Sequence, residues 1–351
     1  ILIEIGGNEN NIEEIEETTA TVSPIQFEEL TDELIADEKE NMNLLMDLQL
    51  QVSVELGKVK KPWTDSEGME RTSYSANIMQ NNGEIIEIKT KEVVFTKGAS
   101  SALNLVATSY GLTNINEGDE IITSELEHHS NVLPWQNVAR KKKGVLKYIP
   151  LDSEGKITVD GFKKVLSSKT KVVALTYVSN VMGYITPIKE IIDLAHEAGA
   201  IVIVDGAQAV PHMKVDVKEL DCDFFAFSGH KMLGPTGVGV LYGKYKLLQQ
   251  MDPIEFGGDM NDNVDLFEAH YKDAPFKFET GTPAIAEVIA LKEAIKYLEN
   301  IGFDKIIAHQ DMLTTYLMEQ MLKIEGVKVY NPSATTGVVS FNIHDAHPHD
   351  V

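Results

Sequence analysis

Two residues of this sequence, a lysine and an aspartate, are suited to amine chemistry on a bound cofactor. Lys231 follows a Ser-Gly-His turn and precedes a glycine-rich run, and Asp205 ends an apolar run. A lysine amine can form a Schiff base with a carbonyl, and a carboxylate can hold a pyridinium nitrogen protonated. Each residue alone would be an ordinary surface lysine or strand-terminal aspartate. Together they are the minimum equipment for pyridoxal phosphate chemistry.

A second group of residues is suited to hold a phosphate. Ala99 and Ser100 follow Gly98, in a turn between a predicted strand and a predicted helix, where free amides lie at the positive end of the helix dipole. Ser228 and His230 add a hydroxyl and an imidazole from the turn that carries Lys231. A lone glycine turn would be weak evidence, but the two turns together predict a phosphate site.

Polar residues after other predicted strands are candidates for contact with the cofactor ring. His128 can stack on an aromatic ring and exchange protons near neutral pH, although a helix N-terminus with incidental histidines would also explain it. Asn180 and Gln208 carry amides that can donate to a phenolic oxygen. Asp205 would face the ring nitrogen and raise its pKa, which makes the ring an electron sink.

These residues need a sheet that brings strand ends together. From residue 91 onward, short β-rich runs alternate with helical stretches. The predicted strands are 93–96, 120–123, 145–149, 172–177, 201–205, 224–228 and 238–242. The predicted helices are 100–110, 131–142, 159–166 and 187–198. This alternation predicts an α/β fold with a mostly parallel sheet covered on both faces, which binds ligands beyond the carboxyl ends of its strands.

The chain is long enough for more than one domain. Residues 1–57 are predicted to form an acidic tail and a strand-like segment, and residues 58–90 an unassigned linker. Residues 91–275 are predicted to form the large domain. A smaller domain is expected at 276–351, with a helical pair at 283–301 and 304–324 and a strand at 337–343. Because the sequence starts without a methionine and stops soon after this strand, we expect it to be a fragment.

Composition limits the classes of partner. The net charge of −23 argues against a nucleic-acid partner, because a protein that contacts phosphates needs basic residues. The sequence has no apolar run of membrane-spanning length and no signal segment at its start. Cys222 is the single cysteine, which excludes an intrachain disulfide framework and favours a cytoplasmic location.

Several motifs resemble, in the right order, those of group II cysteine desulfurases of the SUF system. This group lies within the class V aminotransferase superfamily of fold-type I pyridoxal phosphate enzymes. Two of the matching motifs lie at 127–135, which begins Glu127-His-His-Ser-Asn131, and at 227–237, which contains Ser228-Gly-His-Lys231. The others lie at 95–106, 178–183, 204–208, 257–260, 278–283 and 347–351.

The resemblance implies a role for each candidate residue. Lys231 would form the Schiff base and move the substrate α-proton, Asp205 would pair with the pyridine nitrogen, and His128 would stack on the ring. The remaining cofactor contacts would come from Ala99, Ser100, Asn180, Gln208, Ser228 and His230. Thr282 would reach the phosphate site of a partner subunit, which implies a homodimer. The implied reaction converts L-cysteine to L-alanine and passes persulfide sulfur to a SUF-type acceptor protein for iron–sulfur cluster assembly.

Two features leave alternatives open. In the resembled family the nucleophilic cysteine follows the motif at 347–351, so we expect this chain to be inactive alone, with Cys222 a buried core thiol. The missing loop leaves a selenocysteine lyase or another class V enzyme as alternatives. Residues 43–57, with their acidic lead-in, resemble a segment of flagellar motor switch proteins, which would make the chain an interaction protein instead.

Overall fold

In the computed structural model of the protein, the described residues are 58–64, 70–79 and 85–350. A small antiparallel sheet of order β1-β2-β3 comes first. Its strands are β1 (Lys58–Thr64), β2 (Glu70–Met79) and β3 (Ile85–Lys89). Sequence reasoning assigned no element to 58–90, because polar residues dominate it. The predicted acidic tail and switch-protein-like segment, 1–57, lie outside the described residues.

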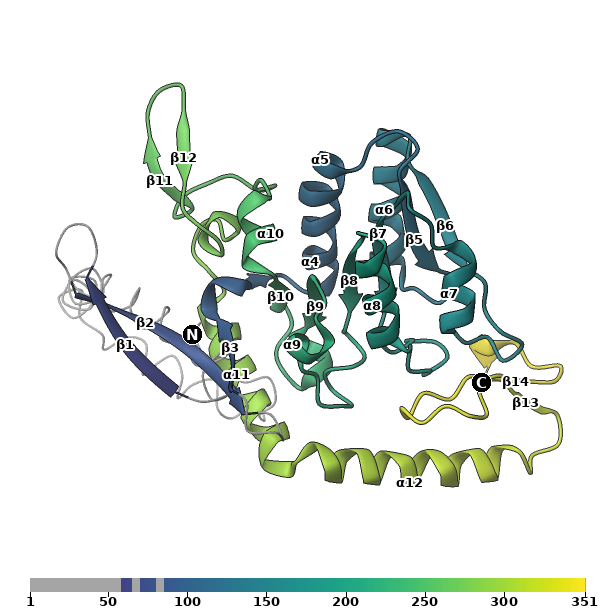
Figure 1. Cartoon of the computed structure of the whole chain (residues 1–351). Coiled ribbons are helices and arrows are strands. Elements are labelled where there is room, and N and C mark those ends of the chain that lie inside the picture. Colours follow the sequence, from purple (N-terminus) through teal and green to yellow (C-terminus); the bar gives the residue numbers. More distant parts are fainter. Residues whose placement is uncertain (1–57, 65–69, 80–84, 351) are drawn as a thin grey trace, which may run out of the picture. The chain divides into compact units, whose positions relative to one another are not determined.

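A seven-stranded sheet forms the centre of the protein (Figure 1). Its order is β4-β10-β9-β8-β7-β5-β6, and β10 is antiparallel to both its neighbours while the other pairs are parallel. The strands are β4 (Val93–Thr96), β5 (Glu120–Ser124), β6 (Val145–Ile149), β7 (Thr170–Thr176), β8 (Ile201–Asp205), β9 (Phe224–Ser228) and β10 (Gly239–Gly243). The predicted α/β fold with a mostly parallel sheet is confirmed.

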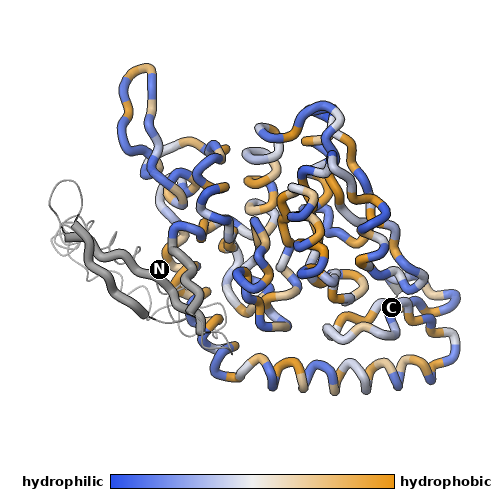
Figure 2. Tube along the Cα trace, in the orientation of Figure 1, coloured by the Kyte–Doolittle hydropathy of each residue, from blue (hydrophilic) through white to orange (hydrophobic). Residues whose placement is uncertain are grey.

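Helices cover both faces of this sheet, which explains the continuous apolar runs of its strands. Val172 of β7 packs in the same core cluster as Trp135 of α6, whereas its neighbour Val173 packs on the other face with Ile191 of α8. Figure 2 shows the resulting band of hydrophobic residues in the central strands. The helices of this region are α4 (Ala99–Val106), α5 (Leu112–Asn114), α6 (His129–Lys142), α7 (Val159–Val165), α8 (Ile188–Glu197), α9 (Val217–Leu220) and α10 (Tyr245–Gln250).

The C-terminal part contains the expected helical pair, α11 (Ile285–Ile301) and α12 (Phe303–Met321). Leu291 of α11 packs against Met232 and Val238, so this helix lies beside the turn that carries Lys231. The strand expected at 337–343 is shorter. The strands here are β11 (Asn261–Val264), β12 (Ala269–Tyr271), β13 (Val327–Val329) and β14 (Phe341–Ile343). Among the described residues no helix is long and apolar enough to cross a membrane.

Candidate functional site

One edge of the seven-stranded sheet collects most of the predicted cofactor residues. Strands β4, β5, β7, β8 and β9 run in one direction, because β10 is antiparallel to both β4 and β9. Their carboxyl ends therefore meet at the same edge. The residues at or just after these ends are Ala99, Ser100, His128, Asn180, Asp205, Gln208, Ser228, His230 and Lys231.

The turn after β4 lies against the end of β9. The amide of Ala99, at the start of α4, donates a hydrogen bond of 2.8 Å to Ser228 Oγ. A Cβ atom on Gly239 would lie only 2.4 Å from Gly98 Cα, so this close approach of two backbones requires glycine. The helix start and the Ser228 hydroxyl are thus held together, and such an arrangement suits an anion.

A chain of polar groups links α4 to His128. Ser100 Oγ lies 2.6 Å from Ser130 Oγ, which lies 3.0 Å from His128 Nδ1. His128 is also the N-cap of α6, where its Nδ1 accepts a hydrogen bond of 3.1 Å from the Ser130 amide. Capping therefore engages Nδ1 and leaves Nε2 for a ligand or a proton. Sequence reasoning missed Ser130, although it follows the paired histidines directly.

The carboxyl of Asp205 is buried at the end of β8, with 5% of the residue exposed. Its Oδ1 accepts a hydrogen bond of 2.9 Å from the Ala207 amide, and among the described residues Oδ2 has no hydrogen-bond partner. Burial raises the pKa of Asp205, while the nearby charges of Lys231 and His128 oppose the rise. A buried carboxyl with one open oxygen suits a cationic ring nitrogen.

A second buried carboxyl at this edge, that of Glu127, was missed by sequence reasoning. Ser124 Oγ donates to its Oε1 over 2.7 Å, and Asn131 Nδ2 donates to its Oε2 over 2.8 Å. Burial raises the pKa of Glu127 to about 7, although these hydrogen bonds oppose the rise. An acid before paired histidines was the only signal in the sequence, and a solvated surface residue would give the same pattern.

The segments after β7 and β8, which carry Asn180 and Gln208, are tied to each other. The Tyr177 amide donates a hydrogen bond of 2.9 Å to the Asp205 carbonyl oxygen. Gly206 lies so close to β9 that a Cβ atom there would be 1.9 Å from the Phe225 ring. Asn180 and Gln208 are both half-buried, so each keeps part of its side chain accessible at the edge that carries Asp205.

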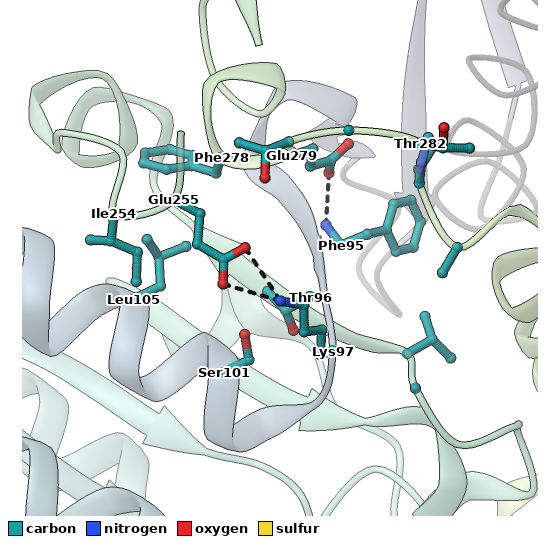
Figure 3. A pocket seen from close by; sticks show the side chains of 16 residues that line it. Phe95, Thr96, Lys97, Ser101, Leu105, Ile254, Glu255, Phe278, Glu279 and Thr282 are labelled. Carbon is teal, nitrogen blue, oxygen red and sulfur yellow. Dashed lines mark hydrogen bonds and ion pairs between the residues drawn. The ribbon is translucent and has the colours of Figure 1, made fainter. Parts of the chain in front are cut away.

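Thr282 lines a cavity of about 200 Å³ next to the turn after β4 (Figure 3). Thr96 and Lys97 line the same cavity, and Lys97 Nζ forms an ion pair of 3.1 Å with Glu255. Thr282 is exposed, and His230 on the Lys231 turn is exposed as well. Within one copy of the chain, Thr282 therefore lies on a surface beside the predicted phosphate turn.

The arrangement fits pyridoxal 5′-phosphate, which combines an anionic phosphate, an aldehyde and a ring nitrogen. The Ala99 amide and Ser228 hydroxyl suit the phosphate. The open Oδ2 of Asp205 suits the ring nitrogen. Lys231, in the short helix Gly229–Met232 directly after β9, supplies an amine near Asp205. These groups come from distant parts of the sequence, and the sheet brings them together.

Cys222 lies away from this edge, in the protein core. It is fully buried and precedes β9, whereas Ser228 and Lys231 follow that strand's carboxyl end. Burial raises the pKa of its thiol above the usual range. The expectation of a buried core thiol is confirmed.

We expect the Cys222 thiol to react with iodoacetamide at least about 100-fold more slowly in the native protein than in denaturant, because burial removes both access and thiolate. Mass spectrometry of timed, quenched samples measures both rates. Equal rates would show that the thiol is accessible and would reopen its assignment as nucleophile.

Comparison with known proteins gives one family model and several similar proteins. A family model described as Aminotransferase class-V matches residues 49–351. A protein of Halalkalibacterium halodurans named "Probable cysteine desulfurase" is 54% identical over 262 residues, covering 75% of this chain and 64% of that protein. A protein of the same name from Staphylococcus aureus is 53% identical over 263 residues, covering 74% of this chain and 64% of that protein.

Two solved structures resemble the fold. A cysteine desulfurase of Escherichia coli matches with a TM-score of 0.71 and 36% identity, covering 75% of this chain and 65% of that one. The apo cysteine desulfurase of Thermococcus onnurineus matches with a TM-score of 0.70 and 40% identity, covering 75% of this chain and 66% of that one. This chain thus spans just under two thirds of the length of the relatives that it matches.

Proposed function

This chain belongs to the aminotransferase class-V family, and from that premise we propose that its site binds pyridoxal 5′-phosphate and removes sulfur from L-cysteine, leaving L-alanine. The observation that carries the proposal is the buried Asp205 carboxyl, with an open oxygen and with Lys231 and His128 as its basic neighbours. The names of the relatives from Halalkalibacterium halodurans and Staphylococcus aureus support this choice of reaction.

Each residue at the sheet edge has a task in this proposal. Lys231 attaches the cofactor through its amine and moves the substrate α-proton. Asp205 holds a positive charge at the ring nitrogen, and when bound the cofactor supplies the electron sink for the α-carbon. His128 contacts the ring, with its orientation fixed by the capping bond to Ser130.

The phosphate is assigned to the helix start and the Lys231 turn. Ala99 and Ser100 contribute from the start of α4, and Ser228 and His230 from the end of β9. Asn180 and Gln208 contact the hydroxyl side of the ring. Thr282 is assigned to the phosphate site of a second copy, because it is exposed beside the cavity next to this turn. The proposed assembly is therefore a homodimer.

The sulfur needs a thiolate acceptor. L-cysteine and a thiol give L-alanine and a persulfide: the thiolate sulfur bonds to the substrate sulfur, the bond from that sulfur to Cβ breaks, and Cβ takes a proton. Cys222 is unsuited to this step, because it is buried away from the site edge. The acceptor thiol is thus assigned to residues other than these 351, with a SUF-type protein receiving the sulfur for iron–sulfur cluster assembly.

Several further assignments belong to the same proposal. The protein is placed in group II of the cysteine desulfurases and in the cytoplasm, where a reduced thiol persists. The large domain is assigned to 91–275 and the smaller one to 276–351, with 1–57 and 58–90 as separate segments. The names of the relatives do not favour a selenocysteine lyase or a flagellar switch protein.

An absorbance titration tests the proposal. We expect pyridoxal phosphate to give the chain a visible absorption band, and L-cysteine to perturb that band at a concentration at least about tenfold lower than L-serine, which lacks the sulfur. Absence of a band would overturn the cofactor assignment. An equal response to both amino acids would overturn the substrate class, and a stronger response to L-selenocysteine would favour the lyase.

A further inference from the structure

The carboxyl of Glu127 joins three segments at the sheet edge that carries the proposed cofactor site. Ser124 at the end of β5 donates to one oxygen and Asn131 in the first turn of α6 donates to the other, at 2.7 and 2.8 Å. The carboxyl also makes a hydrogen bond with the backbone of Thr176 at the end of β7. With 8% of Glu127 exposed, these bonds are shielded from water and tie the two strand ends to the helix.

The position of His128 depends on these bonds. His128 is the next residue after Glu127 and the N-cap of α6, and its side chain lies on the exposed side of the turn. Its Nδ1 is already engaged by Ser130, so the ring turns with the backbone of this segment. Holding Ser124 and Asn131 to one buried carboxyl therefore fixes where the imidazole lies.

Glu127 is also electrically coupled to Asp205. Thr176 is the register partner of Asp205 in the pairing of β7 with β8, so both carboxyls adjoin the same pair of strand ends. Burial raises the pKa of Glu127 to about 7, and the negative charge of Asp205 adds to the rise. The other charged groups nearby are His128 on its own turn and Lys231 after β9, which both act on Asp205. Ser124 and Asn131 do not titrate.

We propose that Glu127 is a positioning residue that holds the His128 imidazole in place and couples cofactor binding at Asp205 to release of its own proton. The inference rests on the proposed pyridoxal phosphate site. A cationic ring nitrogen beside Asp205 offsets the negative charge that disfavours ionised Glu127, so binding favours loss of the Glu127 proton. By reciprocity, ionised Glu127 strengthens cofactor binding. This contribution is small below about pH 6 and fully present above about pH 8.

Three variants separate this role from simple packing. Glu127→Gln keeps the shape and removes the charge, and its amide can donate to Asn131 Oδ1, a buried atom without a partner among the described residues. Glu127→Ala removes both the charge and the hydrogen bonds. Glu125→Gln is the matched control, because Glu125 is exposed two positions earlier.

The first measurement is the dissociation constant of pyridoxal phosphate between about pH 6 and pH 8.5, by absorbance titration of the full chain. We expect the affinity advantage of the wild type over Glu127→Gln to grow about three- to tenfold across this range, as roughly half a unit to one unit of pKa coupling requires. Glu125→Gln should follow the wild type. Parallel pH profiles of wild type and Glu127→Gln would overturn the coupling.

The second measurement is the visible circular dichroism of the bound cofactor, which depends on its surroundings and not on overall stability. We expect Glu127→Ala to change this band as His128→Ala does, with the double variant adding little, while Glu127→Gln retains it. An unchanged band in Glu127→Ala, or additive effects in the double variant, would overturn the positioning role. If Glu127→Ala does not fold, Glu127→Gln at low pH takes its place in this test. A changed circular dichroism band in Glu127→Gln would then overturn the positioning role. A wild type without any band would refute the proposed function itself.

Discussion

Replacing Lys231 with alanine is expected to abolish covalent attachment of pyridoxal phosphate to the chain. The amine of Lys231 lies near the buried Asp205, on the turn directly after Ser228. Borohydride reduces a Schiff base to a stable secondary amine, so the labelled peptide of the wild type should contain Lys231. Exchange of the α-hydrogen of L-alanine with deuterated water should fall by at least about 10³-fold, because the variant lacks both the attachment and the base.

Lys246→Ala is the matched control for this experiment. Lys246 is an exposed lysine on α10, which follows β10 at the opposite edge of the sheet. This variant should be labelled and should exchange the α-hydrogen as the wild type does. A labelled wild-type peptide that lacks Lys231 would assign the Schiff base to another lysine and move the site elsewhere.

The strands and the site edge were predictable because buried parallel strands leave a strong local signal. The apolar residues of β7 and β8 form unbroken runs, since both faces of each strand are covered, and each run stops where polar residues begin. The direction of the strands then places Asp205 and His128 at one edge without any knowledge of side-chain contacts. Strand ends thus predicted which residues gather at this edge of the sheet.

The contacts within the site could not be predicted in the same way. Glu127 is buried, and two of the groups that act on its carboxyl, Thr176 and Asp205, lie far along the chain. The spacing of residues in the sequence does not show contacts with residues so far along the chain. A charged residue in a turn is therefore expected to face water. The bond between Ser100 and Ser130 likewise depends on how α4 and α6 approach each other, although they follow β4 and β5, which are not neighbours in the sheet.

The strands outside the seven-stranded sheet were hard to predict from the sequence for a different reason. The strands β1 and β2 are rich in polar residues, and the short strands β13 and β14 pair over only three residues each. Neither kind gives a clear hydrophobic period, because the alternation of a strand appears only when one face is buried. The role of Thr282 rests on resemblance, since its proposed target lies in a second copy.

Replacing Asp205 with alanine or asparagine is expected to leave pyridoxal phosphate bound but nearly inert. The phosphate contacts at Ala99 and Ser228 and the amine of Lys231 remain in this variant. The negative charge at the ring nitrogen is lost, so the positive charge on the ring is no longer stabilised in the buried site. We expect α-hydrogen exchange of L-alanine, followed by nuclear magnetic resonance in deuterated water, to fall by about 100- to 1000-fold.

Asp223→Asn separates this electrostatic role from the general cost of losing a buried aspartate. Asp223 is buried just before β9, at the opposite end of the strand from Ser228, and its Oδ2 accepts from the Val202 amide at 2.7 Å and pairs with His196 at 2.8 Å. This variant should melt at a lower temperature while each folded, cofactor-loaded molecule exchanges the α-hydrogen at the wild-type rate. Asp205→Asn should show the reverse, with slower exchange and little change in melting temperature. Its stability changes little because burial raises the pKa of Asp205 and so disfavours the charged carboxylate in the folded chain. If Asp205→Asn kept wild-type exchange, another acid would have to face the ring nitrogen, and the buried Glu127 would be the first to replace.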